Sequence, residues 1–403
     1  MLLIAGTGLY FLANVQRVAI PGSLFSELQS ELGVSASWIT GLGASFMYVY
    51  ALNQFVVGFL IERCGGRRVI LIGAGLFCAG AILFPLAHSL LLFYLSRALT
   101  GFGASALYLS LVAETRRTFR ESCFPIALTV VIFTGYAGGI MAGAPFVIAA
   151  GEIGWRPLLL VLGAVGVLCW LLFATACGLD RARAETGRGD ARFSLRPFID
   201  LLRLSNNRTV CLCAGLHFGL YYVLQTVIGK KYLEDFLGIS STRAAWVLSL
   251  MAILAALSGF VPVLLHRLTG ARIKFFIIGA GGMSVFVSGG LVVLTGLGVR
   301  SPAVAVFLCL LAVTASLSPI MIPLLYRTNS PERAGLAVCL FNFSLYVFVA
   351  LLGNAAGLLL GCFEPELRDS VLVYGREAWI AIFAGFFCCS LLVLRLALRI
   401  SDE

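Results

Sequence analysis

Long apolar runs alternate with short polar segments along the whole chain. An α-helix rises 1.5 Å per residue, so about 20 apolar residues cross a hydrocarbon core about 30 Å thick. The runs do not alternate polar and apolar residues over about ten positions, as the strands of a membrane barrel do. The pattern predicts an all-α membrane protein with twelve transmembrane helices, at residues 3–27, 38–61, 69–88, 90–112, 124–149, 156–178, 210–229, 243–265, 275–298, 303–326, 334–361 and 378–399.

Composition supports the membrane class and limits the chemistry. Of the 403 residues, 60% are hydrophobic and 12% are charged, unlike a soluble domain. The first run lacks a basic segment before it and has further runs after it, so we interpret it as a transmembrane helix rather than a cleaved signal peptide. The 12 cysteines are scattered without a CxxC pair, which favours apolar packing over a disulfide framework or metal site. We expect no cofactor.

The placement of charge matters more than its sum. A net charge of +10 could indicate a nucleic-acid partner. However, if the N-terminus lies inside the cell, most lysines and arginines fall in cytoplasmic segments, as the positive-inside rule requires. No nucleic-acid partner is then needed. We expect a monomer in a lipid bilayer, specifically a bacterial inner (plasma) membrane, with both termini cytoplasmic.

The chain reads as two similar halves. We predict an N-terminal six-helix bundle over residues 1–178, a cytoplasmic basic linker over 179–208 and a C-terminal six-helix bundle over 209–403. The sequence "GFLIERCGGRR" at 58–68 follows the second span, and "PVLLHRLTGAR" at 262–272 follows the eighth. Such repetition is typical of transporters built from repeats related by an axis along the membrane normal.

The first of these sequences resembles the cytoplasmic loop signature of the major facilitator superfamily. The resemblance implies two pseudo-symmetric six-helix bundles and a gate at the inner face. The family usually has Asp where this chain has Glu62, and the second copy has His266. Gly58 would allow close helix approach, Gly66 would shape a tight turn and Glu62 would pair with a helix end or an arginine. A topological anchor is the alternative role for these gate residues, Gly58, Glu62, Arg63, Gly66, Arg67 and Arg68.

Three spans carry further resemblances of different weight. "SRALTGFGASALY" resembles the fourth-span pattern of the superfamily, with Arg97 four residues before Gly101. "GYAGGIMAGAPF" resembles a glycine-rich fifth span, although simple helix packing also explains its small residues. "ASFMYVYALNQFVVGFLIERCGGRR" is similar to the second span of anion:cation symporters and sialin-like organic-anion carriers. The fifth-span face consists of Gly135, Gly139, Gly143 and Pro145.

Two arginines lie at membrane depth. In those carriers the first span bears an Asp-Arg pair, which "ANVQRVAIP" resembles with Gln16 and Arg17. Arg17 lies about 5 Å along the axis from the middle of its span, and Arg97 is also near the middle of its own. A charge there costs roughly 2.5–3.5 kcal/mol, so we expect both to face a watery cavity and bind an anion. Alternatively, Arg17 caps carbonyls of a broken helix and Arg97 serves the scaffold.

Other polar groups could complete the site. His217 is the candidate for a coupling proton, because histidine titrates near neutral pH, although a neutral packing role is equally open. Glu114, at the cytoplasmic end of its span, is expected to pair with Arg116 or Arg117. The remaining substrate-binding candidates are Asn14, Tyr48, Gln54, Tyr136, Tyr222, Gln225 and Asn342.

These features favour a secondary active transporter. We expect it to move a small organic anion by alternating access, with proton or cation coupling left open. Proton-driven efflux of an amphipathic compound is one alternative, and a membrane sensor that binds without transporting is another. No HExxH motif, paired intramembrane aspartates or Ser-His arrangement indicates an enzyme.

Overall fold

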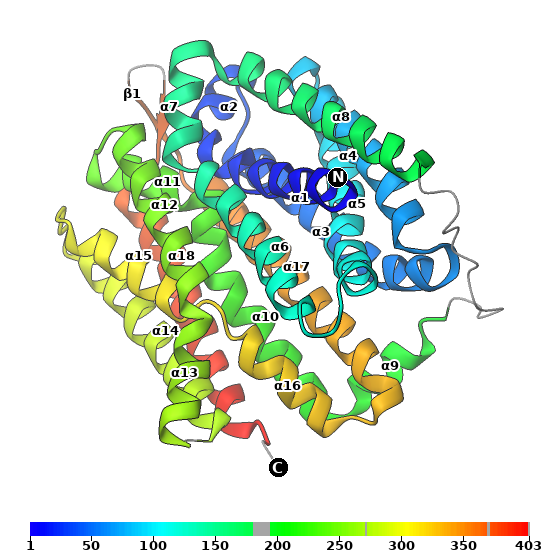
Figure 1. Ribbon diagram of the computed structural model, residues 1–403. Helices are drawn as coiled ribbons and strands as arrows, with labels where there is room; N and C mark the ends of the chain where they lie inside the picture. The colour runs from blue at the N-terminus through cyan, green and yellow to red at the C-terminus, as the bar shows by residue number, and fades with distance from the viewer. Residues whose placement is uncertain (180–193, 271, 369–370, 402–403) are drawn as a thin grey trace. The chain divides into compact units, whose positions relative to one another are not determined.

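The computed structural model describes residues 1–179, 194–270, 272–368 and 371–401. Residues 180–193 of the predicted linker lie outside these ranges. The chain divides into two compact units, which Figure 1 shows as ribbons. Unit 1 contains Met1–Ala19 and Ser45–Ser194, and unit 2 contains Ile20–Ala44 and Leu195–Glu403.

Unit 1 is built from long apolar helices. It contains α1 (Leu2–Val18), most of α3 (Ala36–Cys64), α4 (Gly66–Leu86), α5 (Leu90–Thr118), α6 (Phe124–Met141), α7 (Ala144–Ile153) and α8 (Trp155–Leu179). Glycines set its closest helix contacts, because a Cβ at Gly103 would collide with the backbone of α4 at Gly73 and Phe77. Small residues at such crossings let backbones approach closely in a membrane.

Unit 2 repeats this helical architecture with one small addition. Its two three-residue strands pair antiparallel, with Leu367 opposite Leu372. The elements are most of the π-helical turn η1 (Ala19–Ser23), α2 (Phe25–Leu32), the start of α3, α9 (Arg196–Arg203), α10 (Ser205–Val223), the π-helical turn η3 (Leu224–Ile228), α11 (Gly229–Leu237), α12 (Ser241–Ser258), α13 (Phe260–Thr269), α14 (Ile273–Gly296), α15 (Ala303–Val313), α16 (Ser318–Thr328), α17 (Pro331–Gly361), β1 (Glu366–Arg368), β2 (Val371–Val373) and α18 (Arg376–Arg399).

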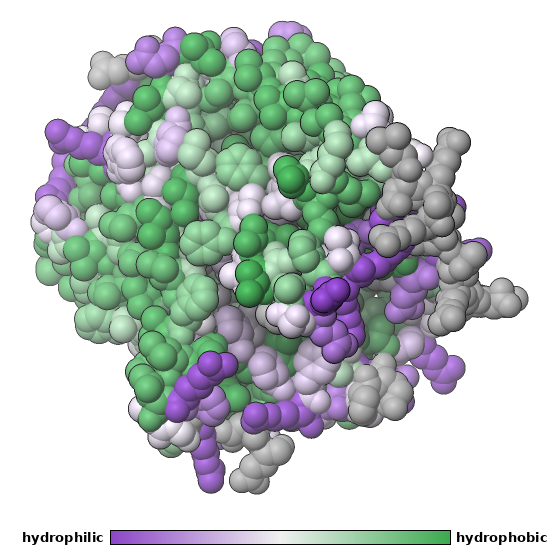
Figure 2. All heavy atoms as spheres, viewed as in Figure 1, coloured by the Kyte–Doolittle hydropathy of each residue, from purple (hydrophilic) through white to green (hydrophobic). Residues whose placement is uncertain are grey.

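The predicted all-α membrane architecture is confirmed. Among the described residues, eleven helices are long and apolar enough to cross a membrane, or twelve if α6 and α7 form one bent span. These two helices meet at an angle of 48° beside Gly143, where one continuous span was predicted. Figure 2 shows apolar side chains over most of the visible face, as expected where lipid is the solvent.

The two halves share an irregular feature. The turn η1 precedes α2 and Gly33, while η3 precedes α11 and Gly238. Both glycines end their helices in the left-handed region, with φ of 60° and 66°. They are 205 residues apart, as are the first residues of η1 and η3. The sequence repeat therefore extends to the position of a helical defect.

Candidate functional site

Arg97 lies in the interior of unit 1. Its side chain is fully buried, and its Nη1 donates to the backbone oxygen of Gln16 at 3.4 Å. The guanidinium also lies 4.5 Å from the centre of the Phe46 ring, close enough for a cation–π interaction. Arg97 thus ties α5 to α1 and α3, which is a role in holding the site together.

Arg17 has a more open environment on α1. It is half-buried, its Nη2 donates to Oδ1 of Asn14, and its guanidinium lies 5.7 Å from the centre of the Tyr50 ring. Asn14 in turn donates to the backbone oxygen of Tyr10 at 2.8 Å, which fixes its amide. A planar cation held this way could bind a carboxylate or sulfonate without first ordering its own side chain.

The other candidates of unit 1 differ in exposure. Gln54 is buried, Tyr48 is half-buried and Tyr136 is exposed. Sequence reasoning did not give weight to Tyr50 and Phe46, the aromatic partners of the two arginines. Their spacing of four residues on α3 puts them on one helix face, a signal that the sequence contains.

The glycine-rich stretch of α6 acts through close contact with α1. A Cβ at Gly135 would collide with the Tyr10 ring, whereas one at Gly139 would meet only Val18, at 3.8 Å. Gly143 is the N-cap of α7, and Pro145 lies in its first turn. Gly135 therefore permits a close crossing, whereas Gly143 and Pro145 lie at the helix break.

Among the candidates of unit 2, Tyr222 belongs to an aromatic group. Tyr222 stacks on Phe218 with ring centres 4.8 Å apart, and Phe218 meets Tyr346 edge to face at 6.0 Å. Gln225, in η3, donates to the backbone oxygen of Leu248 at 2.9 Å and is buried. Asn342, on α17, is half-buried.

His217 is held at both ring nitrogens. Its Nε2 lies 2.7 Å from the backbone oxygen of Thr314, and its Nδ1 lies 2.9 Å from the hydroxyl of Ser284. A neutral ring satisfies both contacts, because Nε2–H can donate to the carbonyl while Nδ1 accepts from the hydroxyl. The side chain is buried and joins α10 to α14 and to the segment after α15.

The gate motif forms a charged corner between α4 and α5. Nε of Arg67 donates to Glu114 at 3.0 Å, and Arg117 lies 3.9 Å from the same carboxylate. The carboxylate itself is nearly fully buried, with 2% of the side chain exposed. Arg117 was an expected partner of Glu114, whereas Arg67 belongs to the motif itself.

The tight turn of the gate motif is made by Gly65 and not, as was predicted, by Gly66. Gly65 adopts a φ of 82° and makes the turn between α3 and α4. Gly66 begins α4, and a Cβ there would lie 3.2 Å from Glu114 Oε1. Glu62, Arg63 and Arg68 are exposed, and Gly58 lies within α3.

A buried charge cluster in unit 2 was not anticipated. Lys230 contacts Glu27 at 3.1 Å and Glu234 at 3.2 Å, while Lys231 contacts Asp235 at 2.8 Å and the backbone oxygen of Leu372. Both lysine side chains are completely buried. The sequence "GKKYLEDF" contained the signal, because Lys and acid recur at a spacing of four residues.

The same cluster joins α2 to the loop before α18. Gln29 donates to the hydroxyl of Tyr374 at 3.0 Å, and the backbone N–H of Tyr374 donates to Asp235 at 3.0 Å. Burial raises the pKa of the Tyr374 phenol, so it remains neutral at physiological pH. We define the outer charge cluster as Glu27, Lys230, Lys231, Glu234, Asp235 and Tyr374.

Metal ligands do not cluster in the part of the chain that the structure describes. The candidates of each unit are instead charged, amide and aromatic side chains carried by long apolar helices. Residues 6–354 match the Major Facilitator Superfamily, and the chain belongs to that family.

Individual relatives cover part of the chain. A probable sulfoacetate transporter, SauU, of Cupriavidus necator is 28% identical over 173 residues, which is 41% of this chain and 38% of the relative. The multidrug resistance protein Stp of Mycobacterium tuberculosis is 28% identical over 201 residues, covering 48% of this chain and 35% of the relative. The alignments thus span less than half the length of these curated relatives.

Solved structures share the fold at low identity. The crystal structure of the peptide transporter POT in complex with sulfate superposes with a TM-score of 0.77 and 15% identity. The match covers 99% of this chain and 94% of that one. The fold is thus shared over nearly the whole length of the chain.

Proposed function

We propose that this chain is a secondary active transporter for a small organic anion, resembling the anion:cation symporter and sialin-like branch of its family. The half-buried guanidinium of Arg17 carries the proposal, because its planar set of N–H donors, placed near the middle of its span, suits a carboxylate or sulfonate. The similarity to a probable sulfoacetate transporter supports a carboxylate or sulfonate cargo.

Transport would proceed by alternating access between the two halves of the chain. We propose bundles over residues 1–178 and 209–403, with the linker and both termini on the cytoplasmic side of a bacterial inner membrane. Residues Ile20–Ala44 pack within unit 2, although the sequence places them in the first half. Exposing the site to the outer side would therefore require contacts such as Lys230 to Glu27 to open.

Coupling to a proton needs a group that changes charge. His217 is our candidate. Protonation would turn its Nδ1 from a hydrogen-bond acceptor into a donor. The contact with Ser284 would then persist if the Ser284 hydroxyl rotates to accept, and would be lost if it does not. Facilitated transport or exchange requires no such group.

Uptake by proteoliposomes tests the proposal. We expect saturable uptake of labelled sulfoacetate or another small organic anion, lost in Arg17→Gln and partly kept in Arg17→Lys. The exposed Arg300→Gln and Arg267→Gln are matched controls for loss of a single charge elsewhere. Thermal stabilisation of the purified protein by the same anion provides a separate measure of binding.

Other results would assign another function. Anion binding without flux would make the protein a sensor. Uptake of an amphipathic cation into inverted vesicles, driven by a pH gradient and insensitive to Arg17→Gln, would favour efflux. The relative Stp is named a multidrug resistance protein. Loss of anion uptake in Arg267→Gln as well as Arg17→Gln would remove the specific role of Arg17.

A further inference from the structure

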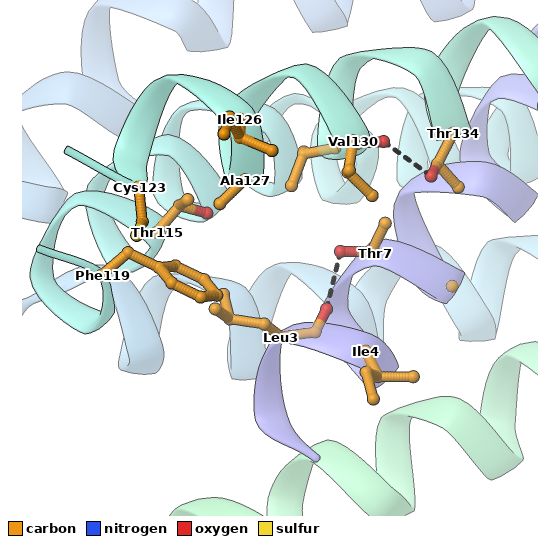
Figure 3. A pocket seen from close by; sticks show the side chains of 12 residues that line it. Leu3, Ile4, Thr7, Thr115, Phe119, Cys123, Ile126, Ala127, Val130 and Thr134 are labelled. Atoms are coloured by element: carbon orange, nitrogen blue, oxygen red, sulfur yellow. Dashed lines mark hydrogen bonds between the residues drawn. The ribbon is translucent and has the colours of Figure 1, made fainter.

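A pocket of about 600 Å³ opens in unit 1 where α1, α5 and α6 diverge (Figure 3). It lies at the N-terminal ends of α1 and α6 and the C-terminal end of α5. Its size falls within the range of small-molecule sites in proteins. The walls are formed by side chains that include Leu3 and Thr7 of α1, Phe119 just after α5, and Ala127, Val130 and Thr134 of α6.

Helix packing explains why the space exists. Gly135 and Gly138 bring α6 against Tyr10 and Phe11 of α1. The N-terminal part of α6, "FPIALTVVIFT", has no glycine, so the two helices cannot approach as closely there. The result is a wedge that widens from the glycine contact toward the helix ends.

The wall of the wedge is apolar. The hydroxyl of Thr7 donates to the backbone oxygen of Leu3 at 2.6 Å, and that of Thr134 donates to Val130 at 2.8 Å, as Figure 3 shows. These hydroxyls are therefore satisfied within their own helices. Ile126 and Val130 are more than half exposed. Such a wall fits a hydrocarbon chain and offers little to a polar solute.

We take the end of the pocket lined by Thr115 and Phe119 as its mouth, and the chain around Phe119 is basic. Arg116 and Arg120 are exposed and flank Phe119 in the sequence. Nearby Glu114 is bound to Arg67, which leaves Glu121 as the exposed acid of this stretch. Thr115 also lines the pocket, and its buried hydroxyl has no hydrogen-bond partner among the residues described. An anionic group with oxygen acceptors suits this combination.

We propose that this pocket binds one anionic glycerophospholipid. An acyl chain occupies the wedge between α1 and α6, and the phosphate lies at the mouth near Arg116 and Arg120. The basic mouth favours a lipid with an anionic headgroup, and the apolar wall contacts its acyl chain. This site is separate from the proposed transport function and does not depend on it.

Native mass spectrometry of the purified full-length protein tests the site. Phosphatidylglycerol and phosphatidylcholine with identical acyl chains are offered at equal concentration. We expect preferential retention of phosphatidylglycerol, reduced about tenfold or more in the double variant Arg116→Gln/Arg120→Gln. The matched control Arg267→Gln/Arg272→Gln removes two exposed arginines from unit 2 and should leave retention unchanged.

A second pair of variants tests the apolar part. Ala127→Trp fills the wedge and should abolish retention, whereas Ala164→Trp alters an exposed apolar position of α8 and should not. Melting temperatures verify that each variant is folded.

Three results would overturn the proposal. These are equal retention of both lipids by the unmodified protein, equal loss in the two arginine variants, and unchanged retention in Ala127→Trp. Displacement of phosphatidylglycerol by a transported amphipathic anion would assign the pocket to cargo and would likewise overturn it. Because no flux is measured, failure here leaves the transport proposal intact.

Discussion

Arg17 and Arg97 carry the same charge in different surroundings. Arg97 is fully buried against a backbone oxygen and an aromatic ring, whereas Arg17 is half-buried beside an amide. A buried cation that is removed leaves its partners unsatisfied and a space behind. An accessible cation is instead available to a ligand. Substitution of Arg97 should therefore mainly lower stability, whereas substitution of Arg17 should mainly affect ligand binding.

We expect Arg97→Gln to lower the free energy of unfolding by about 2–4 kcal/mol, because it loses the contact with Gln16 and the packing on Phe46. Arg17→Gln should change it by less than about 1 kcal/mol, since the side chain is partly exposed. Denaturant or thermal unfolding in the same detergent checks both. An Arg97→Gln protein of unaltered stability would contradict the packing role.

His217 provides a second test at this scale. We expect His217→Gln to cost about 1–2 kcal/mol of stability, because at least one of its two hydrogen bonds is lost. If the ring only packs, the dependence of uptake on pH should keep its shape. A flattened pH profile with normal stability would instead make His217 the proton carrier. Uptake across a series of external pH values measures this.

Single residues show how far sequence reasoning reaches. Arg17 and Arg97 stand out because a charge in an apolar run is costly. Their partners Asn14, Gln16 and Phe46 could not be assigned, because the contacts depend on how α1, α3 and α5 pack. Tertiary structure decides whether the Arg97 side chain contacts water or an aromatic ring. The apolar pattern of α5 does not predict which of the two occurs.

At the scale of elements, the outer charge cluster fastens α2 to α11. Lys230 is completely buried between two carboxylates, whereas 38% of the Glu27 side chain is exposed. Removing the buried member of a pair leaves charges without compensation, and removing an exposed member does so far less. The cluster should therefore respond asymmetrically to mutation.

We expect Lys230→Met to destabilise the protein by about 3 kcal/mol or more, since Glu234 and Glu27 lose their shared cation. Glu27→Gln should cost about 1 kcal/mol or less, because Glu234 still neutralises Lys230. Unfolding midpoints of the two variants, with the exposed Glu62→Gln as a control for a lost carboxylate, measure the difference. Equal losses would show that the lysine is not compensated as the contacts indicate.

Element boundaries were predicted unevenly. The apolar runs predicted the spans, because hydrocarbon thickness fixes a minimum length. The bend between α6 and α7 was not predicted, since Gly143 and Pro145 are also compatible with a continuous packed helix. Likewise, the turn glycine of the gate motif is Gly65, and only the observed φ distinguishes it from its neighbour.

At the scale of the molecule, the segment Ile20–Ala44 has a special position. It belongs to unit 2 by its contacts, yet α1 and α3 continue from it into unit 1. Ser26 donates to Glu234 at 2.9 Å, which marks one attachment of the segment to unit 2. If transport requires the segment to detach, a covalent link at this place should stop it.

We expect the double variant Ser26→Cys/Glu234→Cys, bridged by a short bifunctional thiol reagent or by oxidation, to lose most of its uptake and to recover it after reduction. Each single cysteine variant, treated in the same way, controls for the 12 native cysteines. Unaltered uptake by a protein proved to be bridged would show that the segment stays on unit 2 throughout the cycle.

The overall architecture was predictable for a physical reason. A lipid environment permits few solutions for a polytopic chain, and the repeated loop sequences indicated two related halves. The sharing of residues 20–44 was not predictable. It depends on contacts such as Thr40 with Gly357, which are distant in the sequence and carry no local pattern.

The matching turns η1 and η3 should restrict how the sequence of this chain evolves. A Cβ at Gly22 in η1 would lie 2.6 Å from the backbone oxygen of Thr226 in η3, so each copy of the defect restricts the other. If the halves descend from a duplicated gene, neither copy could straighten alone without disturbing its sister. Related sequences should therefore keep glycine at position 22 whatever residue stands at position 226, and a larger residue at position 22 would show that the two turns can move apart.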